Sequence, residues 1–236
     1  MNDVLILKGD GLNSEIETKF AFEEVGLKTQ LIDVGDLINR PSILQEFRVF
    51  VIPGGFSYAD ELGGGKILAK KLEKGLGREL LNFSKNTDNL LLGICNGFQV
   101  FLHLNLFELP VKSCLTYNSH FKFENRDVKL NSSKSSSSPW LTYLKDKDIK
   151  WVIRNGEGRF EVDSQINLDD YIAFKYSENI NGSFSNIAGI HDISGRVLGL
   201  MPHPECNIFD FNSFKKDTGY FLFKGAQSFI RGELNG

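Results

Sequence analysis

Three residues of this chain have side chains that together could carry out acyl transfer, namely Cys95, His203 and Glu205. Cys95 is the centre of a Gly-Ile-Cys-Asn-Gly run at residues 93–97, which directly follows an apolar run at 90–92. A nucleophile between two glycines after a strand indicates a sharp strand-to-helix turn that exposes the nucleophile. The amides at the start of the next helix favour a thiolate. We therefore predict a catalytic cysteine; the simpler alternative is a small buried residue.

His203 and Glu205 lie in a Met-Pro-His-Pro-Glu run at 201–205, after the last apolar run of the chain. Residues two apart in an extended segment project to the same side, and prolines restrict the backbone around them. A carboxylate can then hold one ring nitrogen while the other faces outward, as in a catalytic triad. A proline-stiffened loop with an incidental histidine is the alternative. The cysteine turn elsewhere in the chain favours the triad.

A glycine pair, Gly54 and Gly55, follows another apolar run at 49–52. Because glycine has no Cβ, such a pair can turn backbone amides toward a ligand, as an oxyanion hole requires. A plain turn is the alternative, but the pair lies one strand before Cys95 and at the same predicted sheet end. Three further glycines at 63–65 lack the Lys-Ser/Thr ending of a phosphate-binding loop, so we expect a flexible loop there.

Apolar runs at 4–7, 49–52, 90–94 and 197–200 predict strands, of which 4–7 and 49–52 are expected to be buried. Residues 29–32 predict a further strand, and the strands up to 90–94 alternate with helical segments. The first helix is expected to start with a capping box, Ser14 to Glu17, and to end at Gly26. This order predicts an α/β fold with an open, mostly parallel sheet and helices on both faces. Additional β segments are expected in the C-terminal half, within one domain spanning residues 1–236.

Composition narrows the class of protein. The 236 residues carry a net charge of −3, without the basic excess of a nucleic-acid-binding protein, and no apolar run reaches membrane-spanning length. Three scattered cysteines fit neither a disulfide framework nor a zinc site. The chain start lacks the form of a signal peptide, so we expect a cytoplasmic protein. A serine-rich stretch at 132–138 is expected to be a mobile surface loop.

Together these runs resemble the class I, or triad, glutamine amidotransferases. More narrowly, they resemble the glutaminase subunit of phosphoribosylformylglycinamidine synthase. The matching runs lie at residues 53–58, 93–99, 181–183, 187–189 and 201–205. The resemblance implies a flavodoxin-like amidotransferase fold, with Cys95 as nucleophile, His203 as general base and acid, and Glu205 as its orienting partner.

The same resemblance implies further roles around the cysteine. The backbone amides of Gly55 and Asn96 would form the oxyanion hole. The glutamine pocket would include the residues Gly54, Phe56, Gln99 and Asn118.

The resemblance also implies partners. Glutamine would be the substrate, and ammonia would pass to a large synthetase subunit that binds ATP and Mg²⁺ and makes formylglycinamidine ribonucleotide. A small accessory subunit would complete the complex. This chain itself would need no metal or cofactor, and we expect no nucleic-acid or membrane partner.

The sequence departs from the family pattern at three places, one of which is the N-terminal segment 9–13, where the family has Pro-Gly-x-Asn-Cys. Ala59 stands where the family has glycine, and Arg154-Asn155 stand where it has Ala-His. Two alternative functions stay open. One is an amidotransferase or cysteine hydrolase that serves another acceptor. The other is a non-catalytic regulatory subunit of the same fold.

Overall fold

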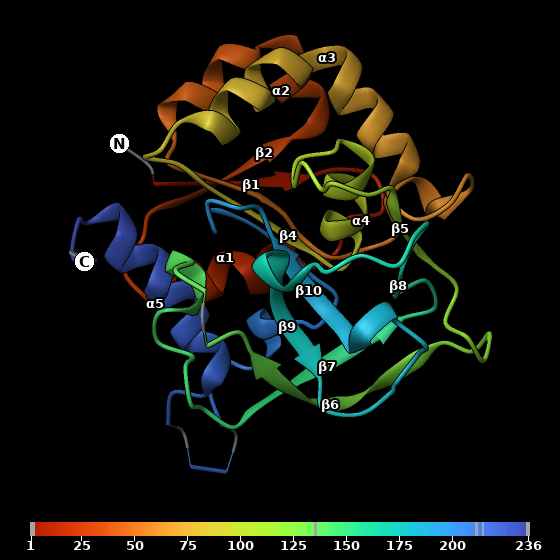
Figure 1. The fold of residues 1–236 in the computed structure, drawn as a ribbon. Helices are drawn as coiled ribbons and strands as arrows, with labels where there is room; N and C mark the ends of the chain where they lie inside the picture. Colours follow the sequence, from red (N-terminus) through yellow and green to blue (C-terminus); the bar gives the residue numbers. More distant parts are fainter. Residues whose placement is uncertain (1–2, 135, 211, 214, 235–236) are drawn as a thin grey trace.

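The computed structural model describes residues 3–134, 136–210, 212–213 and 215–234 (Figure 1). The prediction that the chain start is not a signal peptide concerns residues 1–2 in part, and these two residues lie outside the described residues. The regular elements found in these ranges, in chain order, are β1 (Val4–Lys8), α1 (Glu15–Glu24), β2 (Thr29–Asp33), α2 (Val34–Asn39), β3 (Val49–Ile52), α3 (Lys66–Lys85), β4 (Leu90–Ile94), α4 (Asn96–His103), β5 (Ser113–Thr116), β6 (Glu124–Ser132), β7 (Ile149–Asn155), β8 (Arg159–Val162), β9 (Ile172–Tyr176), β10 (Ile187–His191), β11 (Val197–Leu200) and α5 (Thr218–Ile230).

A nine-stranded sheet dominates the fold, with strand order β2-β1-β3-β4-β11-β10-β9-β6-β7. The pairs from β2 to β11 are parallel, and the pairs from β11 to β7 are antiparallel. β1, β3, β4 and β11 are almost entirely buried, as expected for strands covered on both faces. The five predicted strands and the α/β fold class are confirmed, and β2 at the sheet edge is only partly buried. A separate antiparallel pair, β5 and β8, lies beside the sheet.

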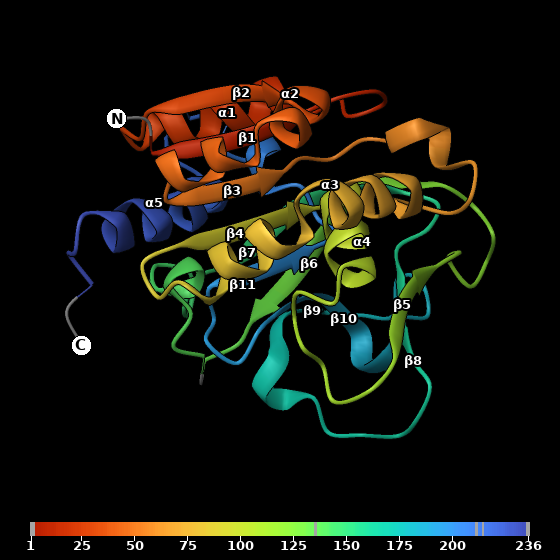
Figure 2. The same ribbon diagram turned by 90° about the horizontal axis from the view of Figure 1, so that it is seen from above.

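Helices cover both faces of the parallel half. The chain moves outward from β1 to β2 and then back across to β3, and right-handed crossovers therefore place α1 and α2 on opposite faces. α1 packs with α5, whereas α3 packs with α2 and α4 (Figure 2). The reversal of strand order between β1 and β3 creates the crevice where ligands bind in such sheets. The segments after β1 and β3 meet there through a bridge between Leu12 and Gly55.

Two local expectations are wrong. Ser14 is the N-cap of α1 but makes no side-chain cap hydrogen bond, so the capping box does not form. Its side chain lies against Gly54 instead, and its carbonyl oxygen accepts a hydrogen bond from the Thr18 hydroxyl at 2.7 Å. The predicted end of this helix at Gly26 is confirmed, because Gly26 has φ +81° and its amide donates to the Glu23 carbonyl.

The serine-rich stretch is the second such case, because two of its described serines are buried and anchored, although Ser137 is exposed. Ser136 and Ser138 are buried. The Ser136 hydroxyl lies 2.8 Å from His191 Nε2, and the Ser138 hydroxyl donates to the Gly195 carbonyl at 2.6 Å. These buried polar partners order a segment whose composition alone predicts disorder. Residue 135 of this stretch lies outside the described residues.

Within the described ranges, no helix is both long and apolar enough to cross a membrane.

The segment after β3 holds consecutive non-glycine residues in left-handed conformation, since Tyr58, Ala59 and Asp60 have φ of 52°, 55° and 52°. A left-handed alanine costs roughly 1–2 kcal/mol, whereas glycine costs roughly 0.5–1 kcal/mol in lost backbone freedom. We therefore expect Ala59→Gly to raise the free energy of unfolding by about 0.5–1 kcal/mol, measured by urea unfolding.

The matched control is Ala69→Gly, because Ala69 is an interior residue of α3. That change is expected to lower the free energy of unfolding by about 1 kcal/mol. Equal destabilisation by both changes would contradict the strain assigned to Ala59.

Candidate active site

Cys95 is the residue that joins β4 to α4, and its backbone is strained. Its φ of 51° and ψ of −103° lie outside the regions that side chains favour. The Cys95 amide donates a hydrogen bond to the Leu200 carbonyl at 2.8 Å, which ties the turn to the end of the neighbouring strand β11. The side chain is 5% exposed. This geometry is the predicted nucleophile turn.

The glycines on either side of Cys95 are required by close approach. A Cβ on Gly97 would lie 2.0 Å from the carbonyl oxygen of Ile52 at the end of β3. A Cβ on Gly93 would lie 2.6 Å from the Gly97 carbonyl oxygen. Side chains at these positions would therefore separate β3, β4 and α4 and remove the support of the strained turn.

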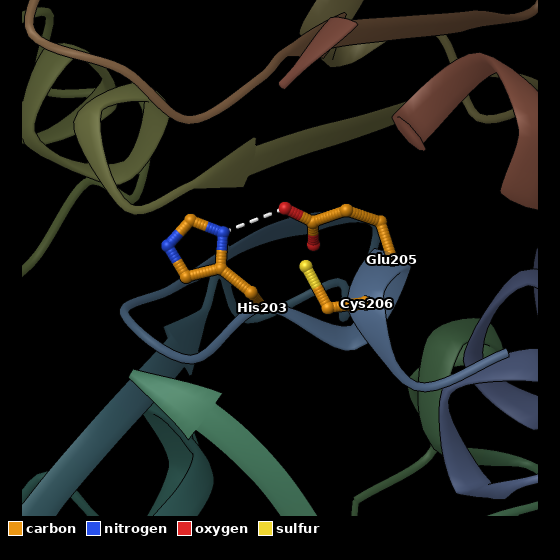
Figure 3. A group of neighbouring side chains, drawn as sticks. All are labelled: His203, Glu205 and Cys206. Atoms are coloured by element: carbon orange, nitrogen blue, oxygen red, sulfur yellow. Dashed lines mark hydrogen bonds and ion pairs between the residues drawn. The ribbon is translucent and has the colours of Figure 1, made fainter. Parts of the chain in front are cut away.

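His203 and Glu205 form a tight buried pair, in which His203 Nδ1 donates to Glu205 Oε1 at 2.6 Å (Figure 3). The pair does not arise from an extended segment, as the sequence predicted. Residues Pro204–Cys206 form a turn of 3₁₀-helix, which brings the carboxylate back over the ring. The His203 amide donates to the Val152 carbonyl of β7 at 2.8 Å. The edge strand β7 therefore holds the backbone of His203 in place.

The charges around His203 favour its protonated form. Burial disfavours the imidazolium, but the Glu205 carboxylate and Cys95 outweigh this effect and raise the pKa of His203 to about 10. The buried Nε2 atom has no hydrogen-bond partner of good geometry among the described residues, and it is the ring nitrogen left for Cys95 or a substrate. Such a pair can hold a thiolate beside an imidazolium, which is the reactive state of a catalytic cysteine.

A cavity of about 140 Å³ opens in front of Cys95. Four segments surround it: the loop after β3, the start of α4, the segment between β5 and β6, and the end of β7 with the turn that follows it. Its lining residues are Gly55, Phe56, Asp60, Cys95, Gln99, Tyr117, Phe123, Arg154, Asn155, Gly156 and Glu157. The cavity is therefore the place where a small substrate can reach the cysteine.

The predicted oxyanion-hole amides belong to Asn96, which follows Cys95 in the chain, and to Gly55, which lines the same cavity as Cys95. The Asn96 amide lies in the first turn of α4, where no carbonyl of the same helix can accept its hydrogen bond. Gly55 has φ +151°, and a Cβ there would lie 2.4 Å from the Gly11 carbonyl oxygen, so only glycine fits. Gly54 does not line the cavity. It packs under the histidine, since a Cβ there would lie 2.8 Å from His203 Cε1.

A polar network holds one wall of the cavity. Asn96 Nδ2 donates to Gln99 Oε1 at 2.9 Å and to Asp60 Oδ1 at 3.2 Å. Gln99 Nε2 in turn donates to the Glu157 carbonyl at 2.8 Å. Burial raises the pKa of Asp60, and the nearby negative charge of Glu157 adds to the shift. Two carboxylates thus converge on the side of the cavity near Gln99.

Asn118 lies behind this wall rather than in it. Its side chain is fully buried, and its Nδ2 donates to the carbonyls of Lys122 and Asn155, each at 2.9 Å. Its Oδ1 accepts from the Gly158 amide and from Asn181 Nδ2, each at 3.3 Å. In this arrangement Asn118 fixes the turn that carries Glu157, and it is not among the cavity-lining residues.

Sequence reasoning missed several groups near the cysteine. Asp60 lines the cavity, and the Arg154 carbonyl oxygen lies 3.8 Å from Cys95 Sγ. Tyr176 of β9 is buried with no hydrogen-bond partner for its hydroxyl in the described part of the chain. Its burial and the nearby charge of Cys95 raise its pKa. No local pattern signals these residues, because β7 and β9 meet the cysteine only in the folded sheet.

Comparison with known proteins identifies the family of this chain. The family model of the CobB/CobQ-like glutamine amidotransferase domain matches residues 1–220. The subunit PurQ of phosphoribosylformylglycinamidine synthase from Methanococcus maripaludis is 37% identical, over 89% of this chain and 84% of the relative. The protein of the same name from Dehalococcoides mccartyi is 36% identical, over 85% of this chain and 84% of the relative.

Solved structures show the same likeness. A chain in the structure of PurLQS from Thermotoga maritima is 27% identical with a TM-score of 0.80, and the match covers 99% of both chains. A glutamine amidotransferase from the same organism, 18% identical with a TM-score of 0.56 over 86% of this chain and 76% of that one, shares the fold. The chain belongs to the CobB/CobQ-like glutamine amidotransferase family and, within it, to the family of the phosphoribosylformylglycinamidine synthase subunit PurQ.

Proposed function

We propose that this chain is the glutaminase subunit of a phosphoribosylformylglycinamidine synthase of purine biosynthesis. The observation that carries the proposal is the interaction of Cys95, which lines a small cavity, with the buried His203–Glu205 pair. The likeness to the PurQ relatives supports the choice of acceptor, since no feature of the cavity alone selects it.

The chemistry is acyl transfer from the side-chain amide of glutamine. The Cys95 thiolate attacks the amide carbon, and the negative oxygen is held by the amides of Gly55 and Asn96. The C–N bond then breaks, and His203 gives its proton to the leaving nitrogen, so that ammonia departs and a thioester remains. His203 next takes a proton from water, which attacks the thioester and releases glutamate and the thiolate. Glu205 holds the imidazolium in place throughout.

The cavity supplies groups for the rest of the glutamine molecule. The carboxylates of Asp60 and Glu157 suit an α-ammonium group, and Gln99 lies between them in the same hydrogen-bond network. Phe56 lines the cavity, whereas Gly54 and Asn118 act indirectly, by leaving room for His203 and by fixing the turn at 155–158.

Ammonia that escapes into water becomes ammonium, so the product must pass directly to a synthetase. That large subunit would bind ATP and Mg²⁺, an accessory subunit would complete the cytoplasmic complex, and this chain would need neither metal nor cofactor. Phe56, Tyr117 and Phe123 line the cavity and are 45%, 57% and 56% exposed. Phe121 lies beside Tyr117 and is 80% exposed, so that the four side chains form an aromatic rim. Exposed aromatic side chains of this kind are typical of the core of protein interfaces. We place the synthetase on this rim.

The direct test is glutamate release from glutamine by the purified chain, with and without its synthetase subunit, ATP, Mg²⁺ and formylglycinamide ribonucleotide. We expect the complete system to stimulate release. Cys95→Ala should reduce release to background, whereas Cys114→Ala, which alters an exposed cysteine on β5, should retain it. Glutamate release at the same rate with and without the synthetase would point to another acceptor. A folded chain without release in any mixture would point to a regulatory subunit.

A second test concerns the protonation of His203. Removing the Glu205 charge by Glu205→Gln is expected to lower the pKa of His203 from about 10 and to slow glutamine turnover by roughly 10²–10⁴-fold. The pKa can be followed by NMR titration of the imidazole ring. His103, whose pKa is lowered by burial at the end of α4, is an internal reference that should not change.

The same shift predicts how stability depends on pH. The folded pKa of His203 exceeds the unfolded value near 6.5, so the stabilisation is fully present below that pH and is lost as the pH rises through about 10. The drop in unfolding free energy over this range should therefore shrink in Glu205→Gln. An unchanged titration of His203 in the variant would contradict the assigned ion pair.

A further inference from the structure

Behind the catalytic imidazole, on the side away from Cys95, lies a third side chain with a donor atom. Cys206 ends the turn that carries Glu205, and its Sγ points toward the second carboxylate oxygen of Glu205 (Figure 3). That oxygen, Oε2, is buried and has no hydrogen-bond partner among the described residues, while Oε1 is taken by His203. One donor atom each from His203, Glu205 and Cys206 lie within 4.8 Å of one another.

We propose that these three residues form a binding site for a thiophilic divalent cation such as Zn²⁺, and that its occupation switches the glutaminase off. Imidazole nitrogen, carboxylate oxygen and thiolate sulfur are the ligands that zinc prefers. In a tetrahedral zinc site such atoms are about 3.3–3.6 Å apart. Side-chain rotations that bring the three donors closer by about 1 Å therefore complete the site, with a water molecule as the fourth ligand.

The surroundings of Cys206 leave one carboxylate oxygen for a cation. Burial raises the pKa of the Cys206 thiol, and the Glu205 and Glu17 carboxylates add to this shift, whereas Arg154 opposes it. Glu205 is paired with His203 through Oε1 alone, and its buried Oε2 has no hydrogen-bond partner in the described ranges. Cys206 is partly exposed, whereas His203 and Glu205 are buried, so a cation can enter from the Cys206 side. Cys206 does not line the substrate cavity, which separates this entry from the glutamine pocket.

Binding would replace protons without any redox change. The S–H bond of Cys206 and the Nδ1–H bond of His203 break, both protons go to solvent, and bonds from sulfur and nitrogen to the metal form. Glu205 turns its carboxylate from the ring to the metal. His203 thereby loses its hydrogen bond to Glu205 and no longer forms the imidazolium, while Cys95 stays unmodified. The scattered cysteines rule out a structural zinc framework, but this site needs only one of them.

The test uses Zn²⁺ and a chromogenic chelator that competes for it, on the purified full chain. We expect one tight site per chain. Cys206→Ser and Cys206→Ala, each checked for an unchanged melting temperature, should weaken it by more than about 100-fold. Cys95→Ser and Cys114→Ser should bind as the unaltered chain does. Co²⁺ bound in place of Zn²⁺ should give a thiolate-to-metal absorption band. This band should be lost when Cys206 is replaced and should remain when Cys95 or Cys114 is replaced.

Other outcomes of the binding test overturn the proposal. Binding that survives loss of Cys206 would place the metal elsewhere. Binding lost with Cys95→Ser would place it on the catalytic Cys95–His203 pair, and absence of tight binding to the unaltered chain would show that no site exists.

Only the inhibition rests on the proposed function. Zn²⁺ should suppress glutamate release by the unaltered chain, and a chelator should restore it. The Cys206→Ser variant should keep its activity when Zn²⁺ is added. The rate of each protein with Zn²⁺ is compared with its own rate without Zn²⁺. Equal inhibition of Cys206→Ser and the unaltered chain would overturn the switch. If the chain released no glutamate, the proposed function would fail while the metal-binding result still stood.

Discussion

The strained backbone at Cys95 is the constraint on which the rest of the site depends. A non-glycine residue at φ of 51° destabilises the folded chain, and contacts in the surrounding structure must offset this cost. Three parallel strands supply it: β3 approaches through Ile52, β4 leads into the turn, and β11 accepts the Cys95 amide through Leu200. The strain keeps the thiol at the start of α4, facing the cavity rather than the core.

The antiparallel half of the sheet completes the site from the other side. It runs from β11 to β7, and β7 returns to bond the backbone of His203. The same strand places the Arg154 carbonyl beside the thiol and leads into the turn that carries Glu157. The position of Cys95 therefore depends on the parallel half, and much of the pocket wall depends on the antiparallel half. Changes at the distant sheet edge can in this way affect His203.

The sequence predicts the parts of this structure that depend on local patterns. Buried strands are readable as apolar runs, and the glycines around Cys95 are readable because close approach permits no other residue. The His203–Glu205 pair was predicted for the wrong reason, since the contact needs a 3₁₀ turn and not an extended segment.

What the sequence could not predict depends on contacts between distant segments. Ser136 is ordered by His191, and Asp60, Glu157 and Tyr176 reach the site from separate elements. The position of Asn118 could not be predicted either. It depends on four hydrogen bonds beneath the turn, and the spacing of residues in the sequence does not indicate them.

The central claim is that Cys95 is the nucleophile of a glutamine pocket. The most direct measurement is the mass of the intact chain, followed by peptide mapping, after exposure to a diazoketone analogue of glutamine. The account predicts a single adduct, located on Cys95, which excess glutamine prevents and which Cys114 and Cys206 do not acquire. An adduct on another cysteine, or labelling of Cys95 that glutamine does not slow, would contradict it.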